Sequence, residues 1–302
     1  MTRLPQIGWL ADGRRLHLQD GPIDLIVEAR GSEANLRAAY DAAVRRFTGL
    51  LDELCDELPA LRKAADPEQC LLKGKVARRM HEAVAPFAAD HFITPMAAVA
   101  GSVAEEILGA MVGAARLDRA YVNNGGDIAL HLADEERFTV GLMDRPDQFG
   151  LMRTIIVDAG DPSRGVATSG RHGRSFSLGI ADAVTVLART AAQADAAATI
   201  IANAVDLPGH PAIVRRPAQE LQSDSDLGAR LVTRDVGPLR EFEIVSALEA
   251  GADKARVLLA SGLIDGAALH LQGQTRVIAL KSFGTSVPDV VPRKETESAI
   301  HA

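Results

Sequence analysis

The segment Tyr121-Val122-Asn123-Asn124-Gly125-Gly126-Asp127-Ile128-Ala129-Leu130 is the point around which the rest of the chain is organised. An apolar run enters it, a Gly-Gly pair crosses it and an alternating run leaves it, which predicts two strands joined by a tight turn. Consecutive glycines leave backbone N–H groups uncovered, and such groups can bind an anion with the side chains of Asn123, Asn124 and Asp127 around it. For this segment alone an ordinary hairpin turn is the favoured interpretation, because Asn, Gly and Asp are common turn residues.

Composition narrows the class of protein. The chain has 302 residues, of which 47% are hydrophobic, so it can bury a sizeable core. Its formal net charge of −7 and its aromatic content of 4% argue against nucleic-acid binding. Cys55 and Cys70 form no CxxC pair, there is no signal-peptide pattern, and we expect no apolar run of membrane-spanning length. These features predict a cytoplasmic protein with neither a nucleic-acid nor a membrane partner.

The pattern of apolar residues and turn signals predicts an α+β fold with mixed or antiparallel sheets flanked by helices. A long amphipathic helix is expected over residues 32–55, and it suits a homodimer interface as well as a core. The other predicted helices cover residues 75–90, 101–116, 190–205 and 240–250. Strands are predicted in residues 1–30 and at 118–123, 127–132, 136–142, 151–157, 183–188, 256–259, 267–271 and 275–280.

We expect a single domain over residues 1–285. It comprises an N-terminal hairpin and helices (1–90), a ligand-binding core (91–205) and a C-terminal α/β segment (206–285), of which 206–235 is rich in loops. Residues 286–302 are predicted to be a flexible tail.

Two further segments have the composition of a binding site. The first places two arginines, a histidine and two hydroxyls beside glycines, which suits a phosphate or carboxylate, although a solvated loop is an alternative. Its candidate residues are Thr168, Ser169, Gly170, Arg171, His172 and Arg174. The second is Asp195 and Thr199, four apart on an alanine-rich helix, where two oxygen atoms on one face suit Mg²⁺. Taken alone, this pair is equally consistent with surface residues. The basic residues Arg78, Arg79 and His81 are interpreted as a solvated helix face.

Four blocks, which follow one another along the chain in the family's order, resemble the FAD:protein FMN transferase (ApbE-like) superfamily. Residues 122–128 (VNNGGDI) are similar to its VNxGGDI turn, 167–170 (ATSG) to its ATSG segment, and 194–199 (ADAAAT) to its AD-A-x-A-T helix. Residues 101–105 (GSVAE) are similar to its G-G-I-A-K step. The resemblance implies an ApbE-like fold and a Mg²⁺ ion bound by Asp195, Thr199 and the backbone carbonyl of Ala104.

The chain also departs from that pattern. Glu105 stands where the superfamily has a lysine, and no HxxDPxTG segment lies between the ATSG block and the Mg²⁺ helix. The chain therefore resembles an uncharacterised sister branch of the superfamily.

Three functions remain open at this point. The first is a Mg²⁺-dependent transferase that moves a flavin or nucleotidyl group from FAD or a related nucleotide, with a protein as one acceptor. The second is a non-catalytic flavin- or nucleotide-binding protein or assembly factor, and the third is a purely structural role. In the first two, residues 123–127 and the Thr168–Arg174 segment hold a small phosphorylated ligand. The sequence identifies no catalytic group.

Overall fold

The computed structural model describes residues 4–145, 148–279 and 300–301. Helices and strands are both abundant, which confirms the predicted α+β class. The chain forms two compact units, which are interleaved along the sequence. Unit 1 comprises residues 1–137, 158–166 and 189–196, and unit 2 comprises residues 138–157, 167–188 and 197–302.

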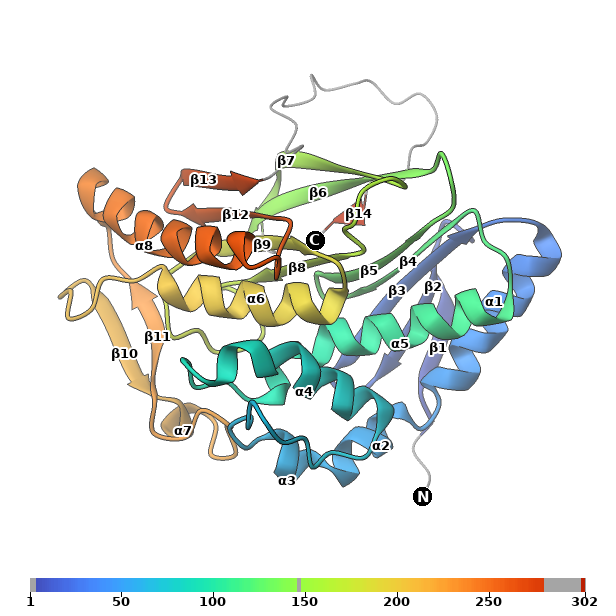
Figure 1. Ribbon diagram of the computed structural model, residues 1–302, viewed down its shortest axis with the longest axis horizontal. Helices are drawn as coiled ribbons and strands as arrows, with labels where there is room; N and C mark the ends of the chain where they lie inside the picture. The colour runs from blue at the N-terminus through green and yellow to red at the C-terminus, as the bar shows by residue number, and fades with distance from the viewer. Residues whose placement is uncertain (1–3, 146–147, 280–299, 302) are drawn as a thin grey trace. The chain divides into compact units, whose positions relative to one another are not determined.

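Unit 1 contains an antiparallel sheet covered by helices (Figure 1). The strands pair in the order β1, β2, β3, β4, β5, and β5 then pairs with the start of β8. Its strands are β1 (Gln6–Trp9), β2 (Leu16–Asp20), β3 (Ile23–Arg30), β4 (Arg119–Asn124), β5 (Asp127–Leu132) and the first residues of β8 (Gly165–Ser169). Its helices are α1 (Glu33–Phe47), α2 (Leu50–Asp56), α3 (Leu58–Leu61), α4 (Lys75–Ala88), α5 (Val99–Ala114) and the first turns of α6 (Ala191–Ala204).

One apolar core holds unit 1 together. Helix α5 packs on β4 and β5, and α1 packs on β2, β3 and α5. Strand side chains alternate between the faces of the sheet, so that Leu18, Val27 and Val122 all enter the core while their neighbours do not. Phe47 and Ile107 fill the space from the helices and are fully buried. The predicted strands at 118–123 and 127–132 are thereby confirmed to within a residue or two.

The single helix predicted over residues 32–55 is instead two helices, α1 and α2. Ser32 caps α1 as expected and accepts a hydrogen bond from the Asn35 amide. Gly49 then adopts φ = 84°, a left-handed conformation that ends α1 and lets α2 begin at Leu50. Apolar spacing alone did not reveal the break, since Phe47, Leu50 and Leu54 all remain in the core.

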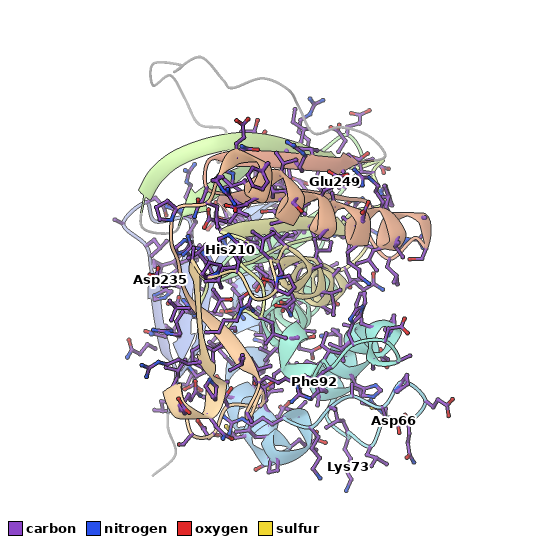
Figure 2. The ribbon with its side chains drawn as sticks, turned by 90° about the vertical axis from the view of Figure 1, so that its left-hand side faces the viewer. Asp66, Lys73, Phe92, His210, Asp235 and Glu249 are labelled. Atoms are coloured by element: carbon purple, nitrogen blue, oxygen red, sulfur yellow. The ribbon has the colours of Figure 1, made fainter. Side chains whose placement is uncertain are left out.

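Unit 2 contains β9 and β12 paired antiparallel, with β13 on the other side of β12. Helix α8 packs on β12 and β13. A two-stranded ribbon of β10 and β11 carries Asp235, and His210 precedes it (Figure 2). The elements are β6 (Arg137–Arg145), β7 (Gln148–Asp158), β9 (Ala183–Ala188), β10 (Ile213–Pro217), α7 (Ala218–Leu221), β11 (Leu231–Val236), α8 (Glu241–Ala260), β12 (Gly266–Leu271), β13 (Gln274–Ala279) and β14 (Ile300–His301).

Two predictions for unit 2 are corrected. Residues 256–259 were expected to form a strand but belong to α8, which runs ten residues further than predicted. The 206–235 segment, expected to be loop-rich, contains β10, α7 and most of β11. The strands predicted at 183–188, 267–271 and 275–280 are confirmed within the described residues.

The predicted flexible tail, 286–302, lies mostly outside the described residues. Its two described residues, Ile300 and His301, form β14, which pairs in parallel with β6. Strands β14, β6 and β7 form a small separate sheet in unit 2.

A segment long and apolar enough to cross a membrane does exist, contrary to the expectation from sequence. It runs from Pro95 to Ala114 and comprises a 3₁₀ turn (Pro95–Ala98) and α5. Half of it is buried in the protein, and it carries the ion-paired Glu105 and Glu106. These features are typical of the core helix of a soluble protein.

Candidate functional site

The Asn-Gly-Gly segment forms the predicted hairpin turn between β4 and β5. Gly125 and Gly126 have φ values of 66° and 113°, a region that glycine enters without steric cost. The Asn123 side chain closes the turn by accepting a hydrogen bond from the Gly126 amide at 2.8 Å. The Gly126 N–H group, one of those predicted to bind an anion, is therefore already hydrogen-bonded within the turn. The turn has fewer backbone N–H groups available to an anion than the sequence predicted.

Asn124 and Asp127 face the opposite side of the sheet from Asn123. They are directly opposed in the β4–β5 register, so their side chains emerge on the same face. The Asn124 side chain is buried there and its Nδ2 donates to the backbone oxygen of Ala100, at the start of α5, at 3.2 Å. The hairpin is thus tied to the amino end of α5.

Asp195 reaches the same end of α5 from α6. Its Oδ2 accepts a hydrogen bond from the backbone amide of Gly101 at 3.0 Å. The first amides of a helix have no partner within the helix, so Asp195 acts as a cap for α5. Gly101 permits this approach, because a Cβ atom there would lie only 2.3 Å from the backbone oxygen of Ala191.

The electrostatics of Asp195 are unfavourable for a carboxylate. Burial and the negative charge of Asp127 raise the pKa of Asp195 well above its usual range. The backbone amides of Gly101 and Ala100 act in the opposite direction and offset only part of this effect. Two carboxylates are therefore held near each other in unit 1 at the amino end of a helix.

The other two predicted metal ligands lie within helices. Thr199 is half-buried on α6, one turn after Asp195. Ala104 is inside α5 with its side chain fully buried in the core, so only its backbone carbonyl is available as a ligand. Among the described residues, no three His, Cys, Asp or Glu side chains gather as a metal cluster. A cation here would therefore need oxygen atoms from the backbone, a hydroxyl or its own ligand in addition to carboxylates.

The Thr168–Arg174 segment belongs to unit 2 and begins at the end of β8. Thr168 Oγ1 is 2.8 Å from Thr185 Oγ1 on β9, and Ser169 is half-buried. At Gly170 a Cβ atom would lie 2.4 Å from the backbone oxygen of Asp182, so glycine is required for this close approach. Arg174 is exposed.

Asp182 holds the basic part of this segment. Its Oδ1 accepts from Arg171 Nε at 2.8 Å and Nη2 at 2.6 Å, and lies 3.2 Å from His172 Nε2. Its Oδ2 accepts from the backbone amide of Gln272. The carboxylate is 5% exposed, so these contacts fix the loop. Arg171 and His172 thus have a structural partner, and a ligand role for them stays a prediction.

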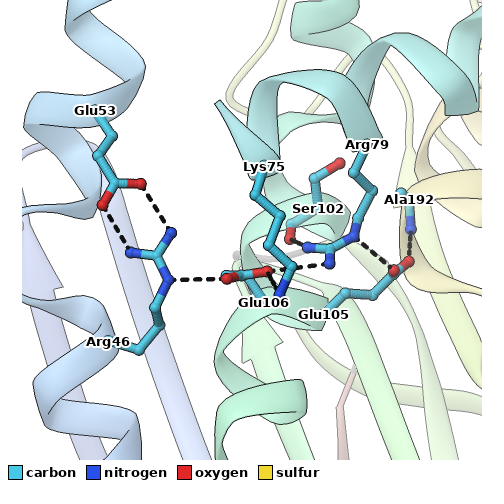
Figure 3. Close-up of polar contacts among 8 residues, drawn as sticks. All are labelled: Arg46, Glu53, Lys75, Arg79, Ser102, Glu105, Glu106 and Ala192. Carbon is cyan, nitrogen blue, oxygen red and sulfur yellow. Dashed lines mark hydrogen bonds and ion pairs between the residues drawn. The ribbon is translucent and has the colours of Figure 1, made fainter. Parts of the chain in front are cut away.

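A network of charges beside α5 was not predicted as part of the site (Figure 3). Glu105 Oε1 accepts a hydrogen bond from the Ala192 amide at 2.7 Å, and its Oε2 pairs with Arg79 Nε at 3.2 Å. Arg79 also pairs with Glu106 at 3.0 Å. In the sequence, this network was indicated by Glu105, which stands where the ApbE-like superfamily has a lysine. That difference was interpreted only as a departure from the family pattern.

This network corrects the interpretation of Arg78, Arg79 and His81 as a solvated face. Only Arg78 is exposed. Arg79 is engaged as described above, and the buried His81 has its Nε2 2.9 Å from the backbone oxygen of Asp66. Helix periodicity did not indicate these partners because they lie on other elements.

The chain matches one family model and several archaeal proteins. A family model described as "AbpE bacteria" matches residues 7–277. The UPF0280 protein of Methanopyrus kandleri is 35% identical over 195 residues, which cover 64% of this chain and 75% of that protein. UPF0280 proteins of Methanothermobacter thermautotrophicus (40% identical over 117 residues) and Methanothrix thermoacetophila (41% over 113) match 38% and 37% of this chain. Those matches span less than half of the two relatives, 44% and 46%.

Proposed function

Since the chain belongs to the family described as AbpE bacteria, we propose that it binds a phosphorylated cofactor, FAD or a related nucleotide, together with Mg²⁺. The ion's protein ligands are Asp195, Thr199 and the carbonyl of Ala104, as the resemblance to ApbE-like proteins implies. Asp127 adds a second carboxylate near Asp195. All of these are hard oxygen donors, the kind that Mg²⁺ prefers.

The observation that carries this proposal is the proximity of Asp195 to Asp127. A carboxylate that serves only to cap a helix gains nothing from a second negative charge nearby. Here burial and that charge together raise the pKa of Asp195. A divalent cation would remove the repulsion and favour the ionised form of both groups.

A bound Mg²⁺ ion supplies positive charge that orients phosphate oxygens and stabilises negative charge on them. In this proposal the phosphate groups approach the amino end of α5, where the helix dipole also favours negative charge. The Thr168–Arg174 segment, which belongs to unit 2, offers hydroxyl, amide and guanidinium donors, and its predicted role in binding rests on the sequence pattern.

Transfer of a flavin or nucleotidyl group is the second candidate, favoured by the VNNGGDI, ATSG and ADAAAT blocks. It requires a group that activates the acceptor, and none of the described residues has been assigned that role. We therefore give cofactor binding precedence over transfer. For either function we expect the protein to be cytoplasmic. The predicted partners are a protein acceptor and, in a homodimer, a second copy of the chain.

Calorimetric titration of the full chain with FAD and with ATP, each with Mg²⁺ and with EDTA, tests cofactor binding. We expect saturable binding of at least one ligand that weakens when EDTA replaces Mg²⁺. Failure of both ligands to bind would contradict the proposal. Incubation with FAD and a candidate acceptor protein, followed by mass spectrometry for FMN addition, separates transfer from binding.

A further inference from the structure

The amino ends of α5 and α6 cap each other. Asp195, on α6, accepts from the Gly101 amide in the first turn of α5. Glu105, on α5, accepts from the Ala192 amide in the first turn of α6. Each helix therefore supplies the carboxylate that satisfies an otherwise unpartnered amide of the other.

Glu105 is itself held in place from the far side. Arg79, on α4, contacts Glu105 Oε2 and also donates through Nη1 to the backbone oxygen of Ser102 at 3.0 Å. Its third contact is to Glu106, which is 4% exposed and also pairs with Arg46 at 2.8 Å and Lys75 at 3.2 Å. Figure 3 shows Arg46, Lys75 and Arg79 converging on Glu106. The position of the Glu105 carboxylate is thus determined by several contacts.

The first turn of α6 has little room to move by itself. Thr190 Oγ1 accepts from the Gln193 amide at 3.2 Å, which caps the helix from its own chain. Gly101 and Ala191 are in backbone contact, as the 2.3 Å clearance for a Cβ atom shows. Ala192 and Asp195 are three residues apart and occupy the same turn, so a shift at Ala192 displaces the Asp195 carboxylate.

We propose that Glu105 is a positioning residue for the cation site: it fixes the first turn of α6 and thereby the carboxylate of Asp195. This inference rests on the proposed function, because it concerns the same cation. It also explains why the Glu105–Arg79 pair spans two helices. A lysine at position 105 could not accept a hydrogen bond from the Ala192 amide, so this arrangement requires a hydrogen-bond acceptor at that position.

Mn²⁺ serves as the probe, and its dissociation constant is measured by electron paramagnetic resonance on the full chain. We compare the wild-type protein with Glu105→Ala and Glu105→Gln. The control is Glu53→Gln, which removes a carboxylate that pairs with Arg46 in the same network but does not contact α6. Partners that orient metal ligands typically change affinity by about 10- to 100-fold when removed.

We expect Glu105→Ala to weaken Mn²⁺ binding at least about tenfold. Glu105→Gln should remain near the wild-type value, because its amide oxygen can still accept from Ala192, and Glu53→Gln should not change it. Wild-type affinity in Glu105→Ala would overturn the inference. A glutamine variant as weak as the alanine variant would also overturn it, since the hydrogen bond to Ala192 would then not be the cause.

Hydrogen–deuterium exchange of residues 190–196, without metal, provides a second readout. We expect faster exchange in Glu105→Ala than in the wild-type protein and in Glu53→Gln. If the wild-type protein does not bind Mn²⁺, the proposed cation site fails, whatever the exchange rates are. If the wild-type protein binds Mn²⁺ but Glu105→Ala exchanges at the wild-type rate, only the positioning role fails.

Discussion

The carboxylate of Asp195 accepts a hydrogen bond from the Gly101 amide, while burial and the negative charge of Asp127 raise its pKa. The hydrogen bond to Gly101 stabilises α5. The repulsion between the carboxylates of Asp195 and Asp127 is unfavourable unless a cation binds near them. The sequence indicated Asp195 through its spacing from Thr199 and through a family motif. Local spacing did not indicate the Gly101 amide as a hydrogen-bond partner, because 94 positions separate Gly101 from Asp195.

The capping role of Asp195 predicts different stabilities for two substitutions. Asp195→Ala leaves the Gly101 amide without its acceptor, which should lower the free energy of unfolding by about 1–3 kcal/mol. Asp195→Asn keeps an oxygen in place and removes the repulsion from Asp127, so its loss should be smaller. Urea denaturation measures both, and equal losses would contradict the capping role.

Close packing at Gly101 predicts a second effect on stability. Gly101→Ala places a Cβ atom 2.3 Å from the backbone oxygen of Ala191, so a helix must shift, at a cost of about 1–3 kcal/mol. Gly109→Ala is the matched control on the same helix, since no atom lies within 4 Å of the new Cβ. That substitution should raise the unfolding free energy by up to about 1 kcal/mol through helix propensity. Thermal denaturation of the two variants should therefore move the midpoint in opposite directions.

Helices and strands were predicted with uneven success, for identifiable reasons. Strands β9, β12 and β13 were found because compact runs of apolar and β-branched residues lie between turn signals. Residues 256–259 were wrongly predicted to form a strand, because a short apolar run does not distinguish a strand from a buried helix segment. In α8, Leu258 is buried whereas Val257 is 61% exposed, so the run covers two sides of a helix.

The amino end of α8 predicts a dependence of stability on pH. Hydrogen bonds from the Arg240 side chain and backbone lower the pKa of Glu243 to about 2. The His210 side chain, whose Nε2 is 3.2 Å from the same carboxylate, adds to this effect. The ionised form is therefore favoured in the folded protein over the unfolded chain, where the pKa is about 4.3.

Stabilisation by Glu243 should be fully present above about pH 5 and should be lost as pH falls towards about 2. The measurement is the difference in unfolding free energy between the wild-type protein and Glu243→Gln at several pH values. We expect this difference to shrink on acidification through that range. A difference that does not vary with pH would show that the charge of Glu243 does not stabilise α8.

The whole molecule is organised in a way that local patterns could not reveal. Strand β5 pairs with β8, although β6 and β7 lie between these two strands in the sequence. Strand β8 and helix α6 each pass from unit 1 to unit 2. Pairing between segments distant in sequence depends on the packed structure and leaves no periodic signal, whereas the α+β class follows from the types of element alone.

The same limit applies to the candidate site. The sequence predicted Asn124 and Asp127 as cofactor ligands and Asp195 as a metal ligand of one site, and unit 1 brings all three to the amino end of α5. It missed Glu105 and Arg79, because their contacts join α4, α5 and α6.

The most direct test of the proposed cation site is a Mn²⁺ titration of the wild-type protein beside Asp195→Asn, with Asp253→Asn on α8 as control. The wild-type protein and the control should bind one Mn²⁺ ion with equal affinity, and Asp195→Asn should bind at least about tenfold more weakly. Equal affinity in all three proteins, or no binding by the wild-type protein, would contradict the assignment of Asp195 as a cation ligand.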